Sequence, residues 1–187
     1  QNKESIKYHV ACKANGDGCL DASKFDGVTK INDHEFELHN AHCFKIDVPQ
    51  IGSAQAIYYD IAALKACCEH IRKNHIPHPI VYIMACRIGP FAGHFYKEIH
   101  KLGGTVYLNP DGHEWMRAKW SAPIRRYWKI SEQMMVKYGS IEETTGISYT
   151  EKKFDYAVEK KIPFFMLIAQ LYLFNIERGA FGSCSRS

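Results

Sequence analysis

The sequence predicts an α/β fold built on a doubly wound parallel sheet. Ile80 to Cys86 is a nearly continuous apolar run, which is typical of a strand covered on both faces. This run also begins a strand, helix, strand alternation with short connections, which implies right-handed crossovers. Ligands of such folds gather at the carboxyl ends of the strands, so we look for the functional site there.

The elements before this run are predicted from local patterns. Ile6 to Ala11 alternates and favours a strand, Lys13 to Asp33 favours a long loop, and Cys43 to Val48 favours the next strand. Apolar residues then recur at helical spacing from Ala54 to about Asn74, where Ser53 is a suitable cap.

The elements after the run complete the alternation. Phe91 to Leu102 is periodic and ends at Gly103-Gly104, which predicts a helix followed by the short strand Thr105 to Leu108. Pro123 opens a further helix that extends to Lys137 and is rich in basic and aromatic residues. The sequence shows no internal repeat and no low-complexity tract.

Composition limits the class of protein. The 187 residues, 46% of them hydrophobic, can bury one core but are too few for two complete α/β domains. No run approaches the ~20 apolar residues of a spanning helix, and no export signal follows Gln1, where the start resembles a cut. Seven cysteines, set largely in apolar runs, favour free thiols in a reducing cytoplasm.

A polar cluster follows the predicted strand that ends at Leu108. It combines two carboxylates, an imidazole and two cations: Asp111, His113, Glu114, Arg117 and Lys119. Carboxylates and imidazoles accept hydrogen bonds from hydroxyls and transfer protons, while Arg and Lys neutralise phosphate. The cluster therefore suits sugar chemistry, although a turn closed by a capping carboxylate explains the same pattern.

Arg87, at the end of the preceding predicted strand, is a candidate for binding a phosphate or an acceptor carboxylate. An arginine that caps strand-end carbonyls would look the same. Gly89 suits a turn with Pro90, and the basic aromatic helix suits either an anionic membrane surface or solvated charges over a buried aromatic face. His34, His39, His42 and Cys43 lack the paired spacing of structural zinc sites, so no metal is predicted.

Three segments carry a specific resemblance to a known family. The runs from Tyr82 to Phe91 (YIMACRIGPF) and from Asn109 to Ser121 (NPDGHEWMRAKWS), with Gly103-Gly104 between them, closely resemble the N-terminal domain of bacterial rhamnosyltransferases. The similarity covers residues 1 to about 138. It implies a family 4 glycosyltransferase of GT-B architecture with two Rossmann-like halves, of which residues 1–138 would be an acceptor-side domain lacking its first strand.

The resemblance also implies an activity. L-rhamnose would pass from dTDP-rhamnose to a lipid-linked precursor of a capsular or cell-wall polysaccharide, at the inner face of the bacterial plasma membrane. The donor-binding domain and first strand would lie outside this chain, so we expect no turnover by the chain alone. No cofactor and no nucleic-acid partner are expected.

Site residues follow from the same resemblance. Related proteins carry a histidine at the position of Asp111, so Asp111 is the first and His113 the second candidate for a catalytic group touching the reacting sugars. The predicted substrate-binding residues lie near the same strand ends: Arg87, Gly89, Asn109, Glu114, Arg117 and Lys119.

Residues 139–187 are predicted to form a divergent helix-strand tail. Tyr138 to Ile141 and Thr145 to Ala157 resemble an uncharacterised TIR-like bacterial module, and Ser148 opens a predicted helix to about Lys161. Pro163 to Ile168 favours a strand. Two alternative functions remain. The absence of the donor-binding domain favours a non-catalytic module that binds glycan or membrane, and the tail favours a TIR-like signalling or nucleotide-processing protein.

Overall fold

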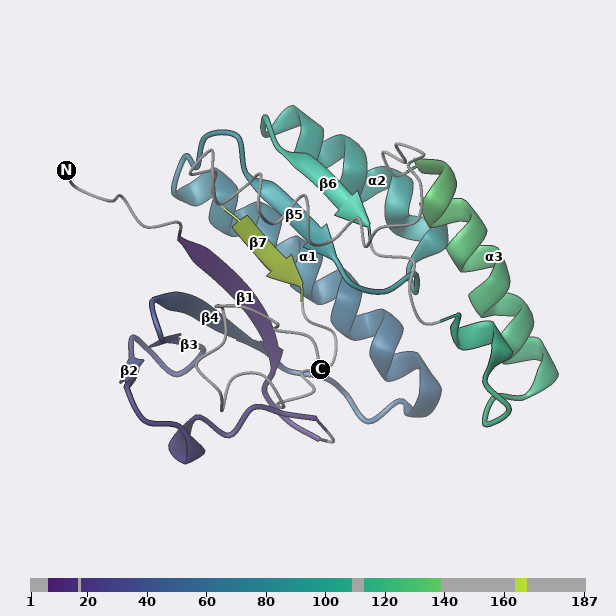
Figure 1. The fold of residues 1–187 in the computed structure, drawn as a ribbon, viewed down its shortest axis with the longest axis horizontal. Helices are drawn as coiled ribbons and strands as arrows, with labels where there is room; N and C mark the ends of the chain where they lie inside the picture. Colours follow the sequence, from purple (N-terminus) through teal and green to yellow (C-terminus); the bar gives the residue numbers. More distant parts are fainter. Residues whose placement is uncertain (1–6, 17, 109–112, 139–163, 168–187) are drawn as a thin grey trace, which may run out of the picture.

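The computed structural model describes residues 7–16, 18–108, 113–138 and 164–167. In this part of the chain, strands form one seven-stranded sheet in the order β2-β3-β4-β1-β7-β5-β6 (Figure 1). The strands are β1 (Tyr8–Lys13), β2 (Val28–Lys30), β3 (Glu35–Leu38), β4 (Ala41–Ile46), β5 (Ile80–Ile83), β6 (Thr105–Leu108) and β7 (Phe164–Leu167). The helices are α1 (Gln55–Lys73), α2 (Gly89–Lys101) and α3 (Ala122–Tyr138), with short 3-10 turns η1 (Ala22–Lys24), η2 (Gly52–Ala54) and η3 (Glu114–Met116).

The sheet is parallel over its main part. The pairs β4–β1, β1–β7, β7–β5 and β5–β6 are all parallel, whereas β3 runs antiparallel to both β2 and β4. The predicted α/β class and the Rossmann-like parallel sheet are confirmed. The loop expected from Lys13 to Asp33 is wrong in part, because it contains η1 and β2. β2 is a short edge strand, so its exposed Thr29 and Lys30 show no apolar alternation.

The C-terminal strand β7 lies inside the sheet, between β1 and β5. Its register places Phe164 opposite Tyr8 on one side and opposite Ile80 on the other. The strand predicted from Pro163 to Ile168 is therefore confirmed, and it belongs to the same sheet as the rest of the chain. The helix predicted from Ser148 lies outside the described residues, and the division at residue 138 stays a prediction.

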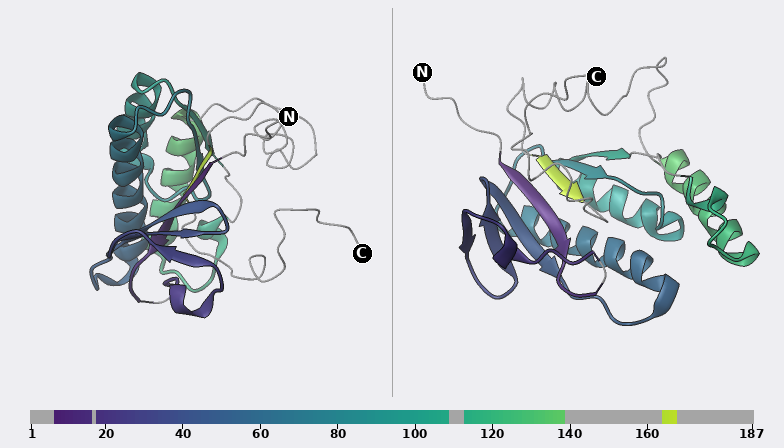
Figure 2. Two further views of the ribbon diagram at one scale, coloured as in Figure 1. Left: turned by 90° about the vertical axis from the view of Figure 1, so that its left-hand side faces the viewer. Right: turned by 60° about the horizontal axis from the view of Figure 1, so that its bottom comes forward.

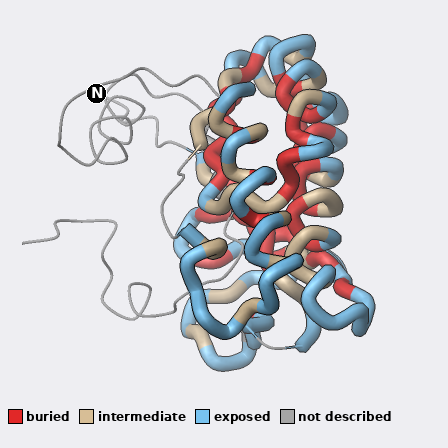
Figure 3. The backbone as a smooth tube through the Cα atoms, turned by 90° about the vertical axis from the view of Figure 1, so that its right-hand side faces the viewer, coloured by how far each residue is buried: buried red, intermediate tan, exposed pale blue. Residues whose placement is uncertain are grey.

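Two apolar clusters cover the two faces of the sheet. The larger one joins β1, β4, β5 and β6 to α1 and α2 through residues such as Ala11, Phe44, Val81 and Val106. Strand alternation sends Val10 and other residues of β1, β3 and β4 to the opposite face, where they pack with Leu20. The helices lie together beside the sheet, with their buried sides turned inward (Figures 2 and 3).

Several predicted boundaries shift by a few residues. The first strand is displaced toward Lys13, and β5 ends at Ile83 because residues 84–88 form the loop into α2. Ser53 does not cap α1. It lies in η2, and the backbone N–H of Gln55 is bound by the Gly52 carbonyl of that turn.

The cysteines in the described ranges are free thiols, as predicted, and most of them are buried. Burial raises the pKa of the Cys68 thiol to about 12. Among the described helices, none is long and apolar enough to cross a membrane.

Candidate functional site

A cleft lies at the carboxyl ends of the parallel strands. It has a volume of about 290 Å³. Lys13 at the end of β1, the start of α1, Arg87 after β5, and segments around η3 and α3 all contribute to it. The lining residues are Lys13, Gly52, Ser53, Gln55, Ala56, Tyr59, Arg87, Glu114, Lys119, Trp120 and Trp128. The cleft therefore forms at the edge of the sheet where the fold predicts a ligand site.

Glu114 organises one wall of the cleft. Its Oε2 accepts a hydrogen bond from Trp120 Nε1 at 2.9 Å, and its Oε1 lies 3.1 Å from Arg117 Nε. Lys119 Nζ lies 4.7 Å from the centroid of the Trp120 ring. Glu114 thus holds the Trp120 indole, and the Lys119 ammonium lies beside that ring. Arg117 contacts Glu114 but is not one of the lining residues.

Arg87 lines the cleft and is held by Asp60 of α1, which is not one of the lining residues. Arg87 Nε and Nη2 donate to the two oxygens of Asp60 at 2.7 and 2.9 Å. Burial raises the pKa of Asp60, while the guanidinium opposes that effect. The pair uses two of the five N–H donors of the guanidinium, so Arg87 still has donors for an anion in the cleft.

Helix α3 fixes the loop that carries Arg87. Tyr127 donates its hydroxyl to the Arg87 carbonyl at 2.9 Å, and Ser131 donates to the Cys86 carbonyl at 2.8 Å. Ser131 Oγ also accepts the N–H of Gly89 at 2.7 Å. Gly89 is buried against α3 and is not one of the lining residues, so its position in the fold is that of a packing residue.

His113 lies outside the lining of the cleft. Its exposed imidazole has Nδ1 3.1 Å from Glu132 Oε1, and the other Glu132 oxygen accepts the indole N–H of Trp115 at 3.0 Å. Its φ of 25° is in the left-handed region. Asn109 and Asp111 lie outside the described residues.

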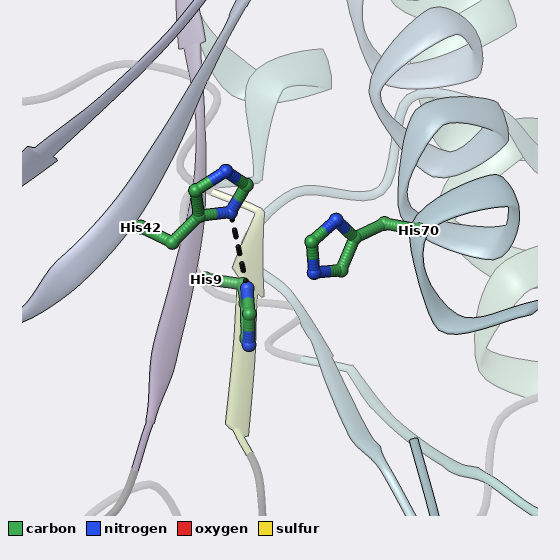
Figure 4. Close-up of side chains that lie close together, drawn as sticks. All are labelled: His9, His42 and His70. Atoms are coloured by element: carbon green, nitrogen blue, oxygen red, sulfur yellow. Dashed lines mark hydrogen bonds between the residues drawn. The ribbon is translucent and has the colours of Figure 1, made fainter. Parts of the chain in front are cut away.

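A second cluster lies at the opposite, amino-terminal edge of the parallel strands. His9 of β1 and His42 of β4 are register partners, and His70 reaches them from the last turns of α1 (Figure 4). Their nitrogens lie within 4.8 Å of one another. Burial, followed by the charges of His70, His42 and Lys7, lowers the pKa of His9 to about 3, so this imidazole is neutral at pH 7.

Sequence reasoning missed several of these residues. Asp60 gave a usable signal, because an acid on the apolar face of a buried helix implies a partner. His9 and His70 gave a weaker signal. Sequence spacing reveals only ligands that are close together in the chain, whereas strand pairing brings His9 next to His42, 33 residues further along. Glu132 looked like one more charge on a solvated helix.

Comparison with known families adds one result. Residues 1–163 match a family model described as a domain of unknown function, DUF1972. The chain belongs to this family. The DUF1972 match extends past Tyr138 and includes residues 138–157, which resemble a second module, so one family model spans both segments. No curated protein and no solved structure matches the chain.

Proposed function

We propose that this DUF1972 chain is the acceptor-side domain of a glycosyltransferase and that its cleft binds a sugar linked to phosphate. The supporting observation is the composition of the cleft wall. Trp120 supplies apolar ring surface beside the buried Trp128, while Lys13, Arg87 and Lys119 supply positive charge at the same edge of the sheet. Carbohydrate rings pack on indoles, and Lys and Arg pair with phosphate.

Glu114 makes this wall rigid before a ligand arrives. Its two oxygens are engaged by Trp120 and Arg117, so the indole does not have to be ordered on binding. Groups that are fixed in advance lose less side-chain entropy when a ligand binds. Glu114 therefore acts through Trp120 as well as lining the cleft itself, and its replacement is expected to weaken binding.

The finer specificity is proposed from the resemblance of residues 82–91 and 109–121. It gives transfer of L-rhamnose from dTDP-rhamnose to a lipid-linked precursor, with Asp111 and His113 as the groups that touch the reacting sugars. Since His113 is not one of the lining residues and Asp111 lies outside the described residues, these two roles rest on the resemblance rather than on the cleft. Glu132 supports a role for His113. A carboxylate at Nδ1 orients the imidazole, which leaves Nε2 as the atom for proton transfer.

A lipid-linked acceptor would bring the chain to a membrane surface. Helix α3 favours such a contact, because Arg125, Arg126 and Lys129 are exposed next to the exposed apolar residue Ile130. Met116 of η3, which packs with α3, is 65% exposed. Basic groups together with exposed apolar side chains are typical of surfaces that bind anionic lipid headgroups.

The proposal is tested by ligand-detected NMR with the whole chain. One titrant is a soluble diphosphate-linked glycan with a terminal glucose or glucuronate, and the other is dTDP-rhamnose. We expect the glycan to bind to the wild-type chain. Lys119→Ala should lower the affinity for the glycan by about tenfold, because one phosphate contact is lost. Lys65→Ala, an exposed change on α1 outside the lining, is the matched control.

Two results would overturn the proposal. One is a wild-type chain that binds neither titrant. The other is equal glycan affinity for Lys119→Ala, Trp120→Ala and the wild type, which would place binding outside the cleft. Flotation with vesicles of anionic and of neutral lipid tests the membrane contact separately, with Arg125→Glu expected to reduce binding to the anionic vesicles.

A further inference from the structure

We propose that His9, His42 and His70 form a binding site for a divalent transition-metal ion, with Zn²⁺ as the best fit. Three separate elements converge on this point. β1 and β4 pair in parallel with His9 opposite His42, and α1 packs over the same face of the sheet (Figure 4). The site lies at the amino-terminal edge of the strands, away from the cleft.

The nitrogen positions are close to those that a metal requires. Zn²⁺ binds imidazole at ~2.0–2.1 Å, which places two nitrogens of a tetrahedral site roughly 3.3 Å apart. His9 Nδ1 and His42 Nδ1 lie 3.2 Å apart. One nitrogen of His70 lies within 4.8 Å of the other two. A movement of the His70 side chain by about 1.5 Å would bring this nitrogen to the separation that a tetrahedral ion requires.

Glu35 provides the outer support that such a site needs. His42 Nε2 lies 3.3 Å from Glu35 Oε2, so the carboxylate holds the His42 proton on Nε2. The lone pair of His42 is then on Nδ1, the atom that faces His9. Metal-binding histidines commonly donate their second N–H to a carboxylate in this way, which fixes the ring and raises its basicity.

The donor set determines the class of ion. Neutral imidazoles suit Zn²⁺, Co²⁺, Ni²⁺ and Cu²⁺, whereas Ca²⁺ and Mg²⁺ prefer oxygen ligands. Three protein ligands leave a further position of a tetrahedral ion for water. Because the three histidines come from β1, β4 and α1, a bound ion links the amino-terminal ends of two inner strands to the helix that covers them. We therefore assign the ion a stabilising role.

The test is titration of the whole, tag-free chain with ZnCl₂ by calorimetry, and with CoCl₂ by absorption spectroscopy. We expect one ion per chain, a higher Tm with Zn²⁺, and no response to Mg²⁺. The Co²⁺ spectrum should show ligand-field bands without a thiolate charge-transfer band, because Cys12 and Cys43 point to the opposite face of the sheet.

Variants identify the ligands. His70→Ala should weaken Zn²⁺ binding on the order of 100-fold, and Glu35→Gln by about tenfold, as expected for an outer partner. His78→Ala, an exposed histidine outside the cluster, should bind as the wild type does. The proposal fails if the wild type shows no Zn²⁺ or Co²⁺ binding, if His70→Ala binds with unchanged affinity, or if thiolate bands dominate.

Discussion

Arg87 and Asp60 form a bidentate ion pair between the loop after β5 and the second turn of α1. The Asp60 side chain is 4% exposed and that of Arg87 is 13% exposed. Two charges this deeply buried are tolerated because each satisfies the other. The pair therefore joins α1 to the strand end that bounds the cleft.

Removing one charge of this pair should be costly. Asp60→Asn keeps the shape but leaves the guanidinium without its counter-charge, so we expect a loss of about 3–5 kcal/mol in the free energy of unfolding. Urea denaturation measures it. Glu98→Gln, which breaks the more exposed pair with Arg72, is the control and should cost less than about 1 kcal/mol. Equal, small losses in both variants would contradict the importance of burial.

Gly89 should tolerate no side chain. A Cβ at this position would lie 2.5 Å from Ser131 Cα and 2.6 Å from the Ser131 carbonyl oxygen, both backbone atoms of α3. We expect Gly89→Ala to lower the free energy of unfolding by at least about 1–3 kcal/mol, because the added methyl group forces α2 and α3 apart. The midpoint of thermal unfolding reports this change.

Gly93, one turn later in α2, is the matched control. A Cβ there would lie 3.6 Å from the Tyr138 ring, which is an ordinary contact. Gly93→Ala should stabilise the chain by about 0.5–1 kcal/mol, because alanine is the better helix former. A destabilised Gly93→Ala, or an unaffected Gly89→Ala, would refute the packing argument.

Loss of the hydroxyl should change the free energy of unfolding differently at two buried tyrosines. Tyr96 Oη is buried without a hydrogen-bond partner among the described residues, whereas Tyr59 Oη donates to the Ala11 carbonyl at 2.7 Å. Tyr96→Phe should be neutral or stabilising, since it removes an unsatisfied group. Tyr59→Phe should cost about 1–2 kcal/mol. Urea midpoints distinguish the pair, and equal costs would count against this assignment.

Stability without metal should fall in mild acid. The pKa of His9 is lowered to about 3, first by burial and then by electrostatic interaction with His70, His42 and Lys7, and burial lowers the pKa of His70 as well. The unfolded chain takes up these protons near pH 6.5, so the free energy of unfolding decreases as the pH drops from about 6.5 toward 3. Urea titrations in a chelator at several pH values measure the slope.

His9→Gln removes one of these groups and should flatten the pH dependence. His78→Gln, which replaces an exposed histidine, should keep the wild-type slope. If His9→Gln and the wild type show the same dependence on pH, His9 is protonated in the folded protein and the assigned pKa direction is wrong.

The sequence predicted the elements whose causes are local. The run at Ile80 and the periodic α1 were recognised because burial on both faces and helical spacing leave a clear pattern. β2 was not recognised, because an exposed edge strand has no apolar alternation. β3 does alternate, with Phe36 and Leu38 buried and Glu37 exposed, so its pattern was present in the sequence and was overlooked. Arg87, Glu114 and Lys119 line one cleft, since the carboxyl ends of parallel strands meet, and their role as substrate-binding residues stays a prediction.

The remaining features depend on contacts between distant segments. The Asp60 partner of Arg87 and the Glu132 partner of His113 lie 27 and 19 residues away in the chain. The histidine cluster requires the register of β1 on β4, and that register is set by the whole sheet. No local pattern encodes these distances.

The position of β7 has a consequence for how the chain is made. Strands β1 and β5 are bridged by a strand that leaves the ribosome about 80 residues after β5. Until then the nascent sheet consists of two pieces with open, apolar inner edges, which can pair with the wrong strand or with another chain. Closure of the sheet is a late, long-range event and therefore a slow one, so those edges stay open while synthesis continues.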